Sequence, residues 1–81
     1  MTDYESILIC ALRYALGRRS YMVGTVTRYI ISEIPKLSDK CKKIMITDIE
    51  QAPYYGDDWD KEDWMLLLKK LREDIGKVEH D

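Results

Sequence analysis

Apolar residues recur at spacings of three and four in four separate stretches of the chain, which predicts four amphipathic helices. In the first stretch, Thr2 and Glu5 have the spacing of a capping box, which satisfies two backbone N–H groups at a helix start. Gly17 predicts the end of this helix, since the left-handed conformation that closes many helices costs glycine nothing. The helix is expected over about residues 3–16, and its apolar positions are Tyr4, Ile7, Leu8, Ala11, Tyr14 and Ala15.

The second stretch predicts a helix over about residues 21–34, with Ser20 as its N-cap. Pro35 ends it, because the residue before a proline is displaced from the helical region. The β-branched run in this stretch would also suit a strand, but the helical spacing of the apolar residues favours a helix. Its buried positions are expected to be Val23, Val26, Thr27, Ile30 and Ile34.

The third helix is expected over about residues 39–52, between an N-cap at Ser38 and a stop at Pro53. Its apolar face is Cys41, Ile44, Met45, Ile49 and Ala52.

A loop from Pro53 to Asp58 precedes the fourth helix, expected over about residues 61–76 with Asp60 as its cap. Trp59 and Trp64 have the spacing of a hydrophobic staple. Gly76 marks the expected end, and residues 78–81 are expected to form a frayed tail. The apolar stripe of this helix is Trp64, Leu67, Leu68, Leu71 and Ile75.

These four helices are joined by short connections and none is long enough to be stable alone, so they must pack against one another. A chain of 81 residues supports one modest core. The sequence therefore predicts an all-α fold, a compact four-helix bundle-like domain covering residues 1–81.

The chain has no run approaching the ~20 apolar residues of a membrane span, and its start, Met-Thr-Asp-Tyr-Glu, lacks the features of a secretory signal. We therefore expect a cytoplasmic protein that does not enter the membrane. In that reducing compartment, Cys10 and Cys41 are expected as small buried hydrophobic residues, with a disulfide or a reactive thiol as the alternative.

The charge distribution is uneven although the net charge is only −2. Residues 1–43 hold eight basic and four acidic side chains, or +4, whereas residues 44–81 hold five basic and eleven acidic ones, or −6. This asymmetry is compatible with an anion site in the first half, with an acidic face for a basic partner, or with two halves that neutralise each other across the fold.

The residue types needed for catalysis are scarce. The only histidine, His80, lies beside the C-terminus, and the sequence has no nucleophile elbow and no paired metal-ligand motif. The acidic cluster over residues 57–63 lacks the mid-loop glycine and terminal glutamate of a calcium-binding loop, and capping explains it better. We therefore expect a protein that is not an enzyme and needs neither a metal nor a cofactor.

The most informative stretch is the corner between the first two helices. There a glycine ends one helix, two arginines follow, and a serine opens the next, so free backbone N–H groups and guanidinium groups would meet at one anion site. Phosphate is the expected guest, and Tyr14, Tyr21 and Tyr29 offer rings on which a base can stack. A glycine inside the second helix costs roughly 1 kcal/mol, which suggests close approach of a ligand or another helix. The predicted ligand-binding residues are Arg13, Arg18, Arg19, Ser20, Tyr21, Gly24 and Arg28.

Three other interpretations of the sequence remain open. The corner also fits an ordinary basic helix end with tyrosines in the core. It has the outline of a DNA-binding helix-turn-helix with Thr25, Thr27 and Arg28 at the groove, although the negative net charge makes nucleic acid an unfavourable partner. An inhibitor of a host defence or regulatory protein would instead use its acidic and aromatic surface, with Tyr54, Tyr55 and Trp59 as anchors.

The block Arg13-Tyr14-Ala15-Leu16-Gly17-Arg18-Arg19-Ser20-Tyr21, with the helix after it and the late Asp63-Trp64 segment, resembles a group of small proteins of phages and prophages of Gram-positive bacteria. The resemblance implies an accessory viral protein in the host cytoplasm. Many such proteins antagonise bacterial immunity, and some sequester nucleotide signals. The expected function is therefore sequestration of a small phosphorylated ligand, a cyclic nucleotide above all. Because so small a bundle has difficulty enclosing such a ligand, a homo-oligomer, by default a dimer, is also expected.

Overall fold

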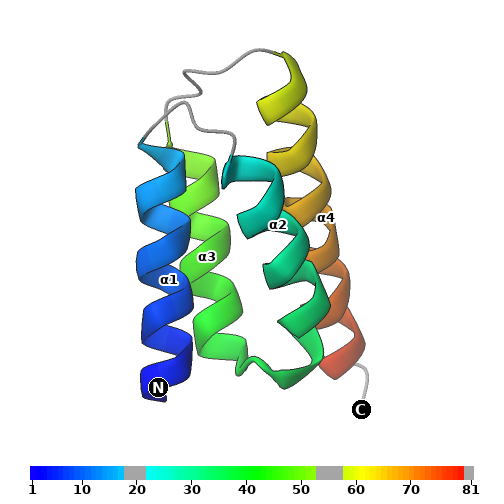
Figure 1. The fold of residues 1–81 in the computed structure, drawn as a ribbon. Helices are drawn as coiled ribbons and strands as arrows, with labels where there is room; N and C mark the ends of the chain where they lie inside the picture. The colour runs from blue at the N-terminus through cyan, green and yellow to red at the C-terminus, as the bar shows by residue number, and fades with distance from the viewer. Residues whose placement is uncertain (18–21, 53–57, 80–81) are drawn as a thin grey trace.

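The computed structural model describes residues 1–17, 22–52 and 58–79, and side chains for residues 1–17, 23–52 and 61–75. All secondary-structure elements of the described residues are helices: α1 (Asp3–Leu16), α2 (Met22–Glu33), the short 3₁₀ helix η1 (Ile34–Lys36), α3 (Asp39–Gln51) and α4 (Asp58–Glu79). The all-α, four-helix fold expected from the sequence is confirmed (Figure 1).

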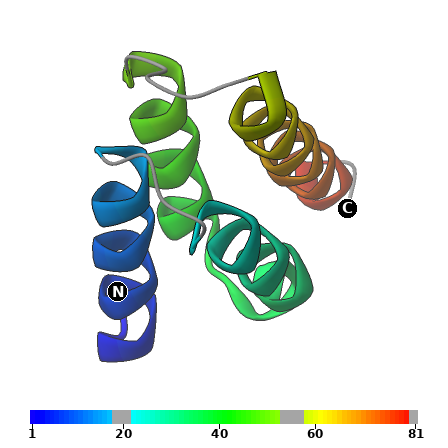
Figure 2. The same cartoon turned by 45° about the horizontal axis from the view of Figure 1, so that its top comes forward.

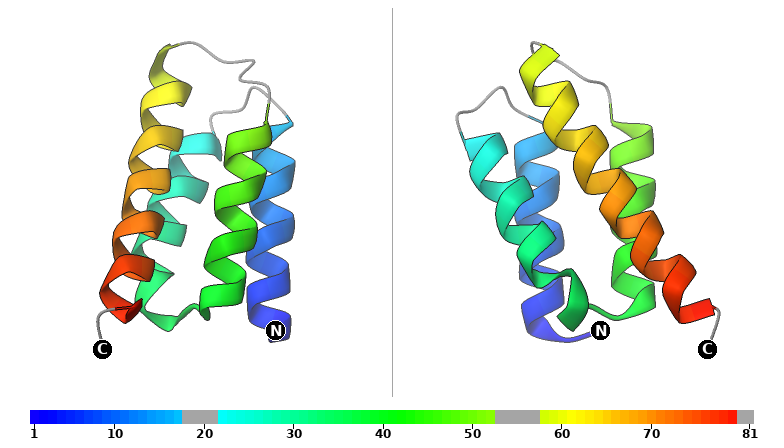
Figure 3. Two further views of the ribbon diagram at one scale, coloured as in Figure 1. Left: turned by 180° about the vertical axis from the view of Figure 1, so that it is seen from behind. Right: turned by 90° about the vertical axis from the view of Figure 1, so that its right-hand side faces the viewer.

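The four helices form a bundle in which α1 packs against α2 and α3, and α4 packs against the same two helices. Viewed toward the helix ends they stand at four corners, with α1 diagonal to α4 (Figure 2). Successive helices run in opposite directions, so α1 and α3 are parallel neighbours, as are α2 and α4 (Figures 1 and 3). The edge between α1 and α3 therefore lies opposite the edge between α2 and α4.

The core is formed by one apolar face from each helix. The predicted stripes of α2, α3 and α4 are confirmed at their central positions, which include Val23, Ile30, Met45, Ile49, Leu67 and Leu71. The stripe predicted for α1 is wrong in part, because Tyr4, Ile7 and Tyr14 are exposed. The apolar positions of α1 span more than one helical face, and the buried face is Leu8, Ile9, Leu12 and Ala15.

The caps predicted at Thr2 and Ser38 are both present. Thr2 and Glu5 form the capping box of α1, and the Ser38 hydroxyl accepts a hydrogen bond from the Cys41 N–H at the start of α3. Gly17 does lie at the C-cap of α1, but its φ of −85° is right-handed, so the left-handed closure predicted for it is wrong.

Helix α4 extends beyond both of its predicted ends. It begins at Asp58, before the predicted cap at Asp60, and continues through Gly76 and into the predicted tail as far as Glu79. An acidic first turn favours the earlier start. A glycine weakens a helix by roughly 1 kcal/mol but does not have to end it when the helix packs along its length. Helix α4 packs against α2, α3 and η1.

The two cysteines have different environments. Cys41 is buried as predicted, whereas Cys10 is exposed, so the prediction of a buried Cys10 is wrong. Cys10 lies on the side of α1 turned away from the face that carries Leu8 and Leu12. Among the described helices, none is long and apolar enough to cross a membrane.

Candidate functional site

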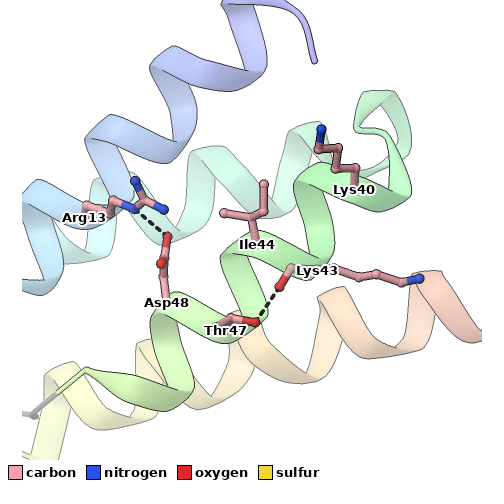
Figure 4. Close-up of a pocket in the computed structure, with 6 residues that line it drawn as sticks. All are labelled: Arg13, Lys40, Lys43, Ile44, Thr47 and Asp48. Carbon is pink, nitrogen blue, oxygen red and sulfur yellow. Dashed lines mark hydrogen bonds and ion pairs between the residues drawn. The ribbon is translucent and has the colours of Figure 1, made fainter.

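A basic groove of about 600 Å³ lies on the surface between α1 and α3. Its lining comes mainly from one face of α3, at positions 40, 43, 44, 47 and 48, the i, i+3, i+4, i+7, i+8 spacing of a single helical face. Helix α1 contributes Arg13 from the opposite side (Figure 4). The basic groove is defined by Arg13, Lys40, Lys43, Ile44, Thr47 and Asp48.

Arg13 is held at one end of the basic groove by an ion pair across the two helices. Its Nε donates a hydrogen bond to Asp48 Oδ2 at 2.8 Å, and this bond, with the charge of Asp48, raises the pKa of Arg13 above its ordinary value. The Arg13 side chain is still 59% exposed, against 18% for Asp48. The pair therefore orients Arg13 while much of its side chain still faces solvent.

Lys40 and Lys43 supply two further cations. Both are exposed, and neither forms an ion pair within the described part of the chain. Lys40 and Arg13 stand on the same side of α3 as Ile44, whose side chain lies between them, while Lys43 extends away along the helix (Figure 4). Among the described lining residues Asp48 is the only acidic one, so these residues carry a formal charge of +2 over a partly apolar floor.

The structure does not bring the predicted ligand-binding residues of α1 and α2 together. Arg13 reaches toward α3, whereas Gly24 and Arg28 face α4 on the opposite edge of the bundle. A Cβ added at Gly24 would lie 3.0 Å from Arg28 Nη1 and 3.7 Å from Asp63 Oδ2. The close approach expected at Gly24 is therefore made by its own helix and by α4.

The remaining predicted site residues cannot be placed. Arg18, Arg19, Ser20 and Tyr21 lie outside the described residues, as do Tyr54 and Tyr55, and the side chain of Trp59 also lies outside them. Lys40 and Lys43 were missed from the sequence. Their helical spacing with Ile44 is visible in the sequence, but the packing of their helix beside Arg13 cannot be seen there.

Two buried ionisable side chains serve the fold. Glu5 accepts hydrogen bonds from the N–H and hydroxyl of both Thr2 and Ser38, so it joins the starts of α1 and α3. These bonds, led by that from the Ser38 N–H, lower the pKa of Glu5 to about 2. Burial lowers the pKa of Lys42, but hydrogen bonds to Asp74 and Asp39 and their charges outweigh it, and the net shift is upward.

Nothing in the described residues forms a metal site, since no group of three or more histidine, cysteine, aspartate or glutamate side chains is placed to hold an ion. The described side chains also leave no buried polar atom without a hydrogen-bond partner. The basic groove is a candidate site to which a predicted ligand-binding residue, Arg13, contributes. No protein-family model, curated protein or solved structure matches the chain.

Proposed function

We propose that this protein is a non-enzymatic binder of a small phosphorylated ligand, a nucleotide or cyclic-nucleotide immune signal, which it sequesters. The observation that supports the proposal most directly is the basic groove, where Arg13 and Lys40 flank the apolar Ile44 side chain and Lys43 adds a third cation on the same helix. The proposed role, sequestration, rests on the resemblance of the sequence to phage accessory proteins. The host cytoplasm is the proposed place of action.

The charge of the basic groove suits a phosphate group. Lysine ammonium groups bind phosphate as point charges, and a hydrogen bond to a charged partner contributes about 1.5–3 kcal/mol, more than a neutral one. Lys40 and Lys43 have no protein carboxylate to give up within the described residues, so no ion pair has to break when an anion binds. Arg13 retains donors beyond the one bound to Asp48.

The rest of the basic groove suits a nucleoside. Ile44 provides an apolar surface for a base or ribose, and the Asp48 carboxylate can accept a hydrogen bond from an exocyclic amine or a ribose hydroxyl. Arg18 and Arg19 follow Gly17 directly in the sequence, and we include them, with Ser20 and Tyr21, as further ligand residues. Gly24 and Arg28 are left out, because they face α4.

The experiment is a thermal-melt and calorimetric titration with a panel of linear and cyclic mono- and dinucleotides. A ligand at ~100 times its Kd adds about 2.7 kcal/mol of stability, which raises Tm measurably. The double variant Lys40→Gln/Lys43→Gln is expected to weaken binding of the active ligand at least about tenfold, the equivalent of roughly 1.4 kcal/mol. Arg13→Gln is expected to weaken it further.

The matched control is Lys69→Gln/Lys70→Gln, which removes the same two charges from an exposed stretch of α4. The control should bind like the wild type. The proposal fails if no nucleotide raises Tm, or if the two double variants lose affinity equally, because the loss would then reflect net charge and not the groove.

A second candidate function is inhibition of a host protein through the aromatic and acidic region around Tyr54, Tyr55 and Trp59. In its favour, α4 exposes Met65 and Leu66 about two turns beyond its start. A pull-down from host lysate should then recover one specific protein that Trp59→Ala fails to capture. Recovery of the same protein by both forms would contradict this function.

A further inference from the structure

We propose that the basic groove selects a guanine nucleotide, with the edge of the base at the Arg13–Asp48 pair and the phosphate at Lys40, and that Asp48 determines this specificity. The base specificity rests on the proposed function and adds to it one base and one orientation of the nucleotide. The order of charged and apolar side chains along the groove supports it (Figure 4).

The two ends of the basic groove differ in charge. At one end Arg13 and Asp48 neutralise each other, with Arg13 Nε 2.8 Å from Asp48 Oδ2. At the other end Lys40 is exposed and forms no ion pair within the described residues. A phosphate beside Asp48 would meet a like charge, whereas no described lining residue repels it at Lys40. The phosphate is therefore assigned to the lysine end, and to Lys40 because Lys43 extends away (Figure 4).

The Arg13–Asp48 pair offers hydrogen-bond donors beside acceptors. Arg13 uses its Nε for Asp48, and its other N–H groups remain as donors. Asp48 receives that bond at Oδ2, and no other described side chain donates to its carboxylate. A carboxylate has lone pairs for about four hydrogen bonds, so further donors can bind to Asp48 without displacing Arg13.

Guanine complements this pair better than the other bases do. Its Watson–Crick edge carries the acceptor O6 beside two donors, N1–H and the N2 amine. The Asp48 carboxylate can accept from both donors while Arg13 donates to O6. Adenine, cytosine and uracil each present only one donor group on that edge, so the carboxylate would form fewer bonds with them.

The spacing along α3 fits a nucleotide that lies along the helix. Lys40, Ile44 and Asp48 follow one another at intervals of four residues, so successive positions are about 6 Å apart along the axis. Ile44 lies between Lys40 and the Arg13–Asp48 pair (Figure 4). An extended nucleotide has its phosphate at one end, the edge of its base at the other, and the ribose and the base ring between them. The ring and the ribose therefore lie over the apolar Ile44 side chain.

The reverse orientation leaves several groups without partners. A phosphate at Arg13 would lie beside the Asp48 carboxylate and compete with it for the guanidinium. The guanine edge would then face Lys40, which donates hydrogen bonds and accepts none, so N1–H and the N2 amine would have no acceptor there. Only the orientation with the base at Asp48 satisfies both ends of the ligand.

The test is isothermal titration calorimetry with guanosine, inosine, xanthosine and adenosine 5′-monophosphates. Inosine lacks only the N2 amine of guanosine, so its monophosphate should bind at least about tenfold more weakly, the effect of one lost hydrogen bond to a charged group. Xanthosine carries a carbonyl oxygen in place of that amine, and its monophosphate should bind more weakly still, because the oxygen faces the Asp48 carboxylate. These comparisons use the wild type and do not depend on the folding of any variant.

The variants separate the two ends of the ligand. Asp48→Asn should reverse the preference, so that xanthosine monophosphate binds better than guanosine monophosphate, because the new amide group donates where the carboxylate accepted. Lys40→Gln should weaken all four ligands by a similar factor and leave their order unchanged. The matched control is Glu50→Gln, which neutralises an exposed carboxylate of α3 outside the groove and should keep both the affinities and the order of the wild type. Circular dichroism should show an unchanged helical fold in each variant.

The base specificity and the proposed function fail in different ways. Equal affinities of the wild type for guanosine and inosine monophosphates, tighter binding of adenosine monophosphate, or an order that Asp48→Asn leaves unchanged would overturn the specificity and leave nucleotide binding in place. If none of the four monophosphates binds but another nucleotide does, the specificity again fails alone. Absence of binding by every nucleotide would overturn the proposed function as well.

Discussion

The two cysteines differ in their environment because they lie on different helical faces. Cys10 is exposed on α1, while Cys41 is buried at the start of α3 beside Glu5. Burial, followed by the charge and hydrogen bond of Glu5, raises the pKa of Cys41 to about 11. The thiolate is the form of cysteine that attacks a thiol reagent, so the two cysteines should react at different rates.

We expect a disulfide-exchange reagent to modify one thiol rapidly in the native protein at low concentration, and the second only after denaturation. In Cys10→Ser the rapid phase should be absent, and in Cys41→Ala it should be unchanged. Equal rates for both thiols in the native wild type would contradict the placement of Cys41 in the core.

Glu5 links two helix starts, and its lowered pKa makes that link dependent on pH. The pKa of Glu5 falls from an ordinary value of 4.5 to about 2, because Ser38 and Thr2 donate hydrogen bonds to the carboxylate. The folded state therefore binds this proton less readily than the unfolded state. The stabilisation from Glu5 is full above about pH 4.5 and is lost as the pH falls through about 2.

The measurement is the free energy of unfolding in urea as a function of pH. Glu5→Gln should be less stable than the wild type at neutral pH, and the difference should shrink between pH 4.5 and 2. The control Glu62→Gln changes an exposed carboxylate on α4 and should follow the wild-type curve. A constant difference between Glu5→Gln and the wild type across this range would contradict the account.

At the scale of the elements, a buried ion pair joins α3 to α4. The Lys42 side chain is 3% exposed, and its Nζ lies 2.6 Å from Asp74 Oδ2 on α4 and 3.1 Å from Asp39 Oδ1 on its own helix. Removing one partner of a buried pair leaves a charge without full compensation. The loss in the free energy of unfolding should be reduced here, because Asp39 still pairs with Lys42 and Asp74 is partly exposed.

Asp74→Ala should therefore lower the free energy of unfolding by about 1–3 kcal/mol, less than the 3–5 kcal/mol of a fully buried pair. Glu73→Ala changes the preceding, exposed residue, whose pair with Lys69 spans 4.0 Å, and should cost about 0.5 kcal/mol or less. Urea titrations at neutral pH compare the two. Equal losses would show that the Lys42 pair does not hold α4 in place.

The sequence predicted the elements better than the faces they present. Capping at Thr2 and Ser38 is local chemistry, and both helix starts were confirmed. The faces of α1 were harder, because apolar residues around more than half of the helix do not say which of them are buried. Ile7 and Tyr14 fit the helical spacing, yet Leu8 and Leu12 face the core.

The candidate site was predictable only in part for a related reason. Arg13 was singled out from its own stretch, and the spacing of Lys40, Lys43 and Ile44 along one face was present in the sequence. The contact between Arg13 and Asp48 joins residues 35 positions apart, and only the packing of α1 beside α3 creates it. Likewise, the separation of Arg13 from Arg28 is a property of the bundle and not of the sequence spacing.

For the whole molecule, part of the uneven charge distribution is resolved by folding. Two ion pairs, Arg13 with Asp48 and Lys42 with Asp74, join the basic first half of the chain to its acidic second half. This fits the interpretation in which the halves neutralise each other. Lys40 and Lys43, however, form no ion pair within the described residues. The anion affinity we propose is therefore local, and it should weaken with salt because these lysines are exposed.

If a phosphorylated ligand binds between α1 and α3, an NMR titration of ¹⁵N-labelled protein with the most active nucleotide should detect it residue by residue. We expect saturable shifts in the backbone amides of Arg13 and of residues 40–48, with residues 61–71 of α4 unaffected. Shifts confined to α2 and α4 around Gly24 and Asp63, or no saturable shift at all, would contradict it.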